Sequence, residues 1–222
     1  MGNSFLDKGI LLGFCFRPDP HHRPCAEYLY RDDLSFFITD QIDQIFRLKK
    51  RELADKHETN ILKHVSELER SKYDGQLGPM ELQEIRRDVL DTRSDTYDYL
   101  EYYYDNELPQ IISMYELKEQ LRALARSMRS LALGRKEEFD EIVNLWVRED
   151  EYPEVEDGLQ EIREAKEEDM WVCVDAHDLA VRKSGETELG TTDFQDFIRD
   201  GRRELILDVT ALDDVVGIGM TG

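Results

Sequence analysis

The sequence has few cysteines, no long apolar run and fewer basic than acidic residues. Its three cysteines, Cys15, Cys25 and Cys173, form no C-x-x-C pair, and no histidine cluster completes a zinc-binding spacing. We therefore expect them to be reduced packing residues of a cytosolic protein. No stretch approaches the ~20 apolar residues of a membrane-spanning helix, and the N-terminus has no basic region like that of a signal peptide. These absences predict a cytoplasmic protein with no membrane partner.

Positive charge is scarce. Lysine and arginine total 29 against 50 aspartates and glutamates, which gives a formal net charge of −21. A polyanion repels a phosphate backbone, so this charge disfavours a nucleic-acid partner. One explanation is an ordinary acidic cytosolic protein; the other is a protein of a salt-rich cytoplasm, because arginine outnumbers lysine and concentrated salt screens surface charge. A hydrophobic content of 40% is enough for a core and argues against global disorder.

Alternating strand and helix patterns at the two ends of the chain predict an α/β fold. Residues 3–7 are typical of a short buried strand that ends on an acid, and residues 35–38 form a short β-branched and aromatic run typical of a second. Residues 187–192 and 204–210 are predicted to form two further strands. A helix is expected over residues 167–183. Because strands and helices alternate, we predict that the 222 residues form one α/β/α sandwich with a parallel sheet of four or five strands.

Strand signals are almost absent between about residues 55 and 165. Apolar residues there recur three and four positions apart, as in Leu117, Leu121 and Leu124, and glycines and prolines separate the segments. We therefore predict a large helical insertion packed beside the sheet, in which more than one strand would contradict the pattern. The tyrosine-rich run at 97–104 could stack on nucleic-acid bases, but aromatic residues at helical spacing more commonly belong to a core or an interface.

Several acidic residues lie where a predicted strand ends or a helix begins. Asp7 directly follows the first strand, Asp193 follows the third, and Asp196 lies one turn further. Asp169 begins the helix that precedes the third strand, and Asp175 lies within that helix. Because the carboxyl ends of parallel strands meet at one edge of a sheet, we expect these side chains to converge there.

Converging carboxylates repel, and a bound cation relieves that repulsion. Oxygen ligands suit Mg²⁺ or Mn²⁺, and such an ion can activate a bound water and stabilise the displacement of a phosphoryl group. Most acids in a chain this acidic are solvated surface, so the position at a strand end is what distinguishes Asp7 and Asp193. The pattern predicts metal-assisted hydrolysis of a phosphodiester.

Two motifs carry a resemblance to a known family. FLDKGILLGFCF is similar to the opening of PIN domains, in which a strand ends in Asp and an apolar helix follows. LGTTDFQDF resembles the late T-x-D-x-D-F motif of the family, with one extra residue between the two acids. The resemblance covers about residues 1–53 and 165–220 and leaves the helical middle outside the common pattern. It implies a PIN-like fold with an insertion and a metal-dependent ribonuclease.

Carried over to this sequence, the resemblance implies that Asp7 is the first metal-binding acid and Asp193 the fourth, with Asp196 beside it. The third acid is left open between Asp169 and Asp175, with a preference for Asp169 because a carboxylate is favoured at a helix N-terminus. The family further implies that the substrate is RNA and that the metal is Mg²⁺ or Mn²⁺.

Two positions depart from the family pattern. Lys8 stands where Thr or Ser is usual, and its ammonium could pair with Asp7 and compete with a metal. Ile45 falls near the position of the second acid, and the nearby Asp43 and Asp40 are not in register. This incomplete set leaves two alternatives to the ribonuclease, a PIN-like interaction module without catalysis and a flap-type DNA nuclease. The sequence leaves the oligomeric state, including a homo-oligomer, and any protein partner open.

Overall fold

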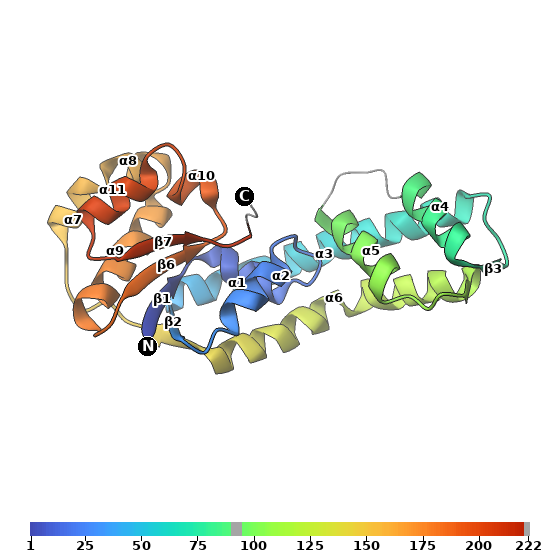
Figure 1. Ribbon diagram of the computed structural model, residues 1–222, viewed down its shortest axis with the longest axis horizontal. Helices are drawn as coiled ribbons and strands as arrows, with labels where there is room; N and C mark the ends of the chain where they lie inside the picture. Colours follow the sequence, from blue (N-terminus) through green and yellow to red (C-terminus); the bar gives the residue numbers. More distant parts are fainter. Residues whose placement is uncertain (90–94, 220–222) are drawn as a thin grey trace.

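The computed structural model describes residues 1–89 and 95–219. Five strands form one parallel sheet in the order β5-β2-β1-β6-β7 (Figure 1). They are β1 (Gly2–Leu6), β2 (Leu34–Thr39), β5 (Val143–Trp146), β6 (Thr187–Thr191) and β7 (Asp214–Gly217). The predicted α/β class and the parallel sheet of four or five strands are confirmed.

Helices cover both faces of this sheet (Figure 1). One face packs against α1 (Lys8–Cys15), α2 (His22–Leu29) and the near ends of α3 (Asp40–Arg70) and α6 (Met114–Ile142). The other face packs against α9 (Glu167–Arg182) and α11 (Arg202–Val209). The remaining helices are α4 (Pro79–Val89), α5 (Asp95–Asn106), α7 (Pro153–Gly158), α8 (Gln160–Ala165) and α10 (Phe194–Phe197).

Strands β1 and β2 bury large apolar side chains because both of their faces are covered. Phe5 and Leu6 of β1 are fully buried, and Phe36 and Ile38 of β2 are each only 2% exposed. Cys15, Cys25 and Cys173 are free and buried in the same core. No helix in the described ranges is both long and apolar enough to cross a bilayer.

The strand order changes direction beside β1. From β1 the chain moves outward to β2 and β5, then returns to place β6 on the other side of β1, with β7 beyond it. Leu6 pairs with Gly190, so the residues that follow β1 and β6 leave the sheet side by side. In a parallel α/β sheet this switch point is where ligands commonly bind.

A long helical arm extends away from the sheet (Figure 1). It consists of α3 and α6, which pack along each other, with α4, α5 and the short strands β3 (Gln76–Leu77) and β4 (Ile112–Ser113) at the far end. The 31 residues of α3 extend for about 46 Å at the usual helical rise. The predicted helical insertion is confirmed, but only its near part packs beside the sheet.

The arm has an apolar interior of its own. Leu117, Leu121 and Met128 of α6 are buried, at positions four and seven apart, and Ile61 and Val65 are the corresponding buried residues of α3. The tyrosine-rich run lies in α5, where Tyr97, Tyr99, Tyr103 and Tyr104 are at most 8% exposed. These four rings belong to the core of the arm, whereas Tyr102 of the same helix is 46% exposed.

Two predictions about strands are wrong. The predicted strand at 204–210 falls almost wholly in helix α11, which ends at Val209, and the edge strand is β7, which begins at Asp214. A short apolar run such as ELILDV does not distinguish a strand from a buried helix. Three strands lie in the described part of residues 55–165, and one of them, β5, joins the main sheet. Because β5 is an edge strand and Leu145 is 63% exposed, its sequence lacks the signal of a buried strand.

Candidate metal site at the carboxyl edge of the sheet

Asp7 lies at the switch point between β1 and β6. It caps α1, accepting hydrogen bonds from the backbone N–H of Lys8 at 2.7 Å and of Gly9 at 3.4 Å. The Thr191 hydroxyl, at the end of β6, donates to its Oδ2 at 3.2 Å. Only 1% of Asp7 is exposed, and this burial raises the pKa of its carboxyl to about 6, although the charge of Lys8 acts in the opposite direction.

Thr191 links Asp7 to the acids that follow β6. Its Oγ1 accepts a hydrogen bond from the backbone N–H of Asp193 at 2.9 Å. The Asp193 carboxylate in turn accepts from the backbone N–H of Asp196 at 3.0 Å and so caps α10. This series of hydrogen bonds fixes the turn after β6 against the end of β1.

Three acids can hold one metal ion between them. Asp169, Asp193 and Asp196 each offer a carboxylate oxygen, and these oxygens lie within 4.8 Å of one another. Asp169 comes from the first turn of α9, whereas Asp193 and Asp196 come from the turn after β6. The site therefore joins two segments that are separate in the sequence.

One oxygen of this group has no hydrogen-bond partner. Asp169 is 1% exposed, and no described atom bonds to its Oδ2. Burial raises the pKa of the Asp169 carboxyl, while the hydrogen bond from Lys8 acts against that rise. A buried carboxylate oxygen without a partner is unfavourable, and a cation at this position would provide one.

Lys8 neutralises part of the charge of Asp169. Its Nζ lies 3.1 Å from Asp169 Oδ1 and 3.4 Å from Glu168 Oε2. The ion pair predicted between its ammonium and Asp7 is not formed, because the side chain turns towards α9 and only its backbone N–H bonds to Asp7. Lys8 nevertheless stands beside the acids, as expected from its position in the sequence.

Lys166 lies closer to the centre of the group. Its Nζ donates to Asp196 and lies 3.5 Å from Asp193 Oδ2 and 3.9 Å from Asp169 Oδ2. The hydrogen bond with Lys166 is the main cause that lowers the pKa of Asp196. Arg202 adds a further cation 3.1 Å from Asp196 Oδ1.

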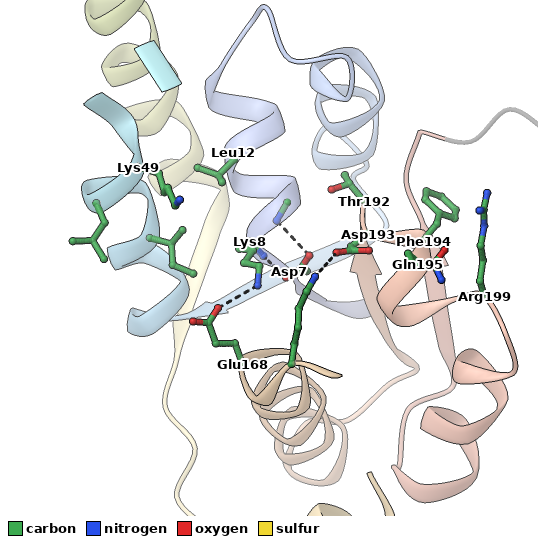
Figure 2. A pocket seen from close by; sticks show the side chains of 14 residues that line it. Asp7, Lys8, Leu12, Lys49, Glu168, Thr192, Asp193, Phe194, Gln195 and Arg199 are labelled. Carbon is green, nitrogen blue, oxygen red and sulfur yellow. Dashed lines mark hydrogen bonds and ion pairs between the residues drawn. The ribbon is translucent and has the colours of Figure 1, made fainter. Parts of the chain in front are cut away.

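A cleft of about 870 Å³ opens beside these acids. Figure 2 shows Lys49 and Leu12 on one side and Phe194, Gln195 and Arg199 on the other, with Asp7 and Asp193 between them. Lys8, Lys49, Lys166 and Arg199 all line it, so the cleft contains cations despite the net charge of −21.

The structure separates the two candidates for the third acid. Asp169 belongs to the group, whereas Asp175 lies further along α9 and pairs with Arg148 at 3.1 Å. Burial raises the pKa of Asp175 to about 6, with Arg148 acting against the rise. Asp7 lies at the same edge and lines the same cleft, but it is not one of the three acids whose oxygens come within 4.8 Å.

The position expected for the second acid is occupied by an apolar wall. Ile45 lines the cleft and brings no carboxylate. Asp43 instead pairs with Lys136 at 2.5 Å and with Arg47 at 3.2 Å. Asp40 is exposed and accepts a hydrogen bond from Gln44. Neither acid is among the residues that line the cleft.

Sequence reasoning missed Lys166 and Arg202. Lys166 precedes Asp169 by three residues, a spacing at which helical side chains meet, so that pair was open to prediction. Its contacts with Asp193 and Asp196 could not be predicted from the sequence, because they depend on the packing of α9 against β6.

Comparisons with protein-family models, with curated proteins and with solved structures find no match. The function is therefore inferred from the residues of this site.

Proposed function

We propose that this protein is a metal-dependent nuclease of PIN type that cleaves RNA phosphodiester bonds with Mg²⁺ or Mn²⁺. The observation that carries the proposal is the group of Asp169, Asp193 and Asp196, whose oxygens lie within 4.8 Å of one another at the switch point of a parallel sheet. The unpartnered Oδ2 of Asp169 supports the fit of a cation. Hard carboxylate oxygens favour Mg²⁺ or Mn²⁺ over softer metals.

Each acid has a distinct part in this proposal. Asp169, Asp193 and Asp196 would hold the ion, which when bound supplies an activated water and stabilises charge on the phosphate. Asp7 would position Asp193 through the Thr191 hydroxyl, which bonds to both residues. Because burial keeps the pKa of Asp7 near 6, its carboxyl can also exchange a proton with the site near neutral pH.

The cations of the cleft would receive the nucleic acid. Lys49 and Arg199 lie on opposite sides of the acids, where phosphates flanking the cleavage site would pass (Figure 2). Phosphate contacts from lysine and arginine supply most of the affinity for a nucleic-acid backbone. RNA as the substrate, rather than DNA, follows from the resemblance to PIN ribonucleases.

A second candidate function is a PIN-like interaction module without catalysis. It is favoured by Ile45 at the place of an acid and by Lys8 and Lys166 among the carboxylates. In that case the lysines take over the role of the metal in neutralising the acids.

Cleavage of end-labelled single-stranded RNA with Mn²⁺ or with EDTA tests the proposal. We expect wild-type protein to cut only with Mn²⁺, and Asp193→Asn and Asp169→Asn to lose at least about 100-fold in rate, as expected when a metal ligand is lost. Asp208→Asn is the matched control, because Asp208 is an exposed acid of α11 outside the cleft. Wild-type protein that is folded but inactive with Mn²⁺ would reject the nuclease in favour of the interaction module.

A further inference from the structure

Lys166 approaches the same three carboxylates that can hold a metal ion. Its Nζ donates to Asp196 and lies within 3.9 Å of both Asp193 and Asp169. These are the acids whose oxygens lie within 4.8 Å of one another. Two cations this close repel strongly where the effective dielectric constant is below that of bulk water. The ammonium and a divalent ion therefore cannot both lie between the carboxylates.

The side chain of Lys166 is free to leave. Its residue lies between α8 and α9 in extended backbone, and 51% of the side chain is exposed. Lys136 is the contrasting case, because it is 10% exposed and is held between Asp43 and Asp140. A lysine stem in solvent is flexible, so the Lys166 ammonium can withdraw without opening the core.

The ammonium satisfies the acids incompletely. Asp169 Oδ2 remains without a hydrogen-bond partner, and Lys166 Nζ is 3.9 Å from it, beyond hydrogen-bonding distance. A divalent ion carries twice the charge and binds several oxygens at once. The site is therefore occupied by a weaker cation that a stronger one can replace.

We propose that Lys166 is a displaceable internal cation. Its ammonium occupies the metal position while no metal is bound, and it moves to a phosphate group of the substrate when the metal binds. The proposal rests on the metal site of the proposed function and adds a coupling between metal and substrate. Lys166 also lines the cleft with Lys49 and Arg199, so its ammonium has an anion-binding place to move to. By linkage, a phosphodiester anion that draws Lys166 away raises the affinity for metal, and metal raises the affinity for the anion by the same factor.

Mn²⁺ binding to the 222-residue chain, measured by electron paramagnetic resonance of the free ion, tests this coupling. We expect Lys166→Met to bind Mn²⁺ at least about tenfold more tightly than wild type, because one competing charge is removed. Lys166→Arg should stay within about threefold of wild type, since it keeps the charge. Lys56→Met is the matched control, because the Lys56 side chain is similarly exposed, at 47%, but lies on α3 outside the cleft and pairs with Asp95 at 2.9 Å.

The same titration with dimethyl phosphate as the probe tests the movement to a phosphate. It should raise the Mn²⁺ affinity of wild type roughly fivefold and that of Lys166→Met by less than about twofold, since a coupling of this size is typical of linked sites. Equal Mn²⁺ affinity of wild type and Lys166→Met, or equal coupling in both, would overturn the inference while leaving the metal site intact. Binding by Lys166→Met alone would mean that Mn²⁺ cannot displace Lys166 in the wild type, which would overturn the inference and refute metal use by the wild type. No binding by either would refute both proposals.

Discussion

The acidic edge of the sheet and the helical arm both bury ionisable groups, but with opposite consequences. At the sheet edge the buried group is an acid, Asp7, and burial raises its pKa to about 6. In the arm the buried groups are two bases, His57 and His64, and burial lowers the pKa of each to about 4. In both regions loss of water favours the neutral form. The same cause therefore gives the two regions opposite responses to pH.

The histidines of the arm act as neutral hydrogen-bonding groups. His57 Nδ1 lies 2.8 Å from the Thr96 hydroxyl, and His64 Nε2 lies 2.8 Å from the Tyr104 hydroxyl. Both contacts join α3 to α5 across the interior of the arm. A buried acid at the sheet edge, by contrast, is unfavourable in its ionised form. The buried histidines of the arm are therefore accommodated as neutral groups, whereas burial of Asp7 lowers stability once its carboxyl ionises.

The largest effect is expected from shortening a buried leucine in each region. Leu121→Ala in α6 and Leu189→Ala in β6 should each lower the free energy of unfolding by about 2–5 kcal/mol, because both side chains are fully buried. If the arm can open separately, Leu121→Ala will speed hydrogen exchange in α4 and α5 and leave β1 and β6 protected. Equal acceleration throughout would show that the two regions form one cooperative unit.

Acidification should weaken the arm before the sheet. Between about pH 6.5 and pH 4 the unfolded histidines take up protons that the buried ones refuse, so stability falls as pH falls. At about pH 5 we expect a loss of roughly 1–2 kcal/mol for each histidine. Hydrogen exchange of α5, compared between about pH 6.5 and about pH 5, measures this loss of stability, and His64→Gln should reduce it. Unchanged protection of α5 would contradict the burial of neutral histidines.

A smaller effect of opposite sign is expected at Asp7. Its raised pKa means that the folded protein holds a proton that the unfolded chain has released between about pH 4 and 6, so the ionised carboxyl lowers stability above about pH 6. Asp7→Asn should therefore raise the stability of the metal-free protein by roughly 1–2 kcal/mol near neutral pH and have little effect below about pH 4. Thermal unfolding with EDTA at the two pH values measures the difference. Destabilisation at both would mean that hydrogen bonds to the carboxylate outweigh its burial.

The smallest expected effect comes from salt and concerns both regions alike. If the charge of −21 reflects a salt-rich cytoplasm, the melting temperature should rise by a few degrees or more between about 0.1 M and 1 M KCl as self-repulsion is screened. A melting temperature that stays flat or falls would favour the ordinary acidic protein.

Local patterns determined much of the architecture. Phe5 and Leu6 of β1 and the apolar run of β2 are buried because both faces of those strands are covered, and α9 shows its apolar residues at helical spacing. The strand-end positions of Asp7 and Asp193 were readable for the same reason, because a polar residue directly after a buried strand marks where the chain leaves the core. Those predictions needed no knowledge of which strands pair.

Pairing and packing decided the rest. The four-residue edge strand β5 is half exposed, so its sequence lacks the pattern of a buried strand. The apolar residues of α11 pack against the sheet, and so short a run does not distinguish a helix from a strand. The choice of Asp169 over Asp175 depends on how α9 lies against β6, and Lys166 joins the acids only because that packing brings the turn after β6 to the start of α9. A sequence records which side of its own element a residue faces. The distance between two charged groups on different elements is set by long-range contacts, and only the tertiary structure contains it.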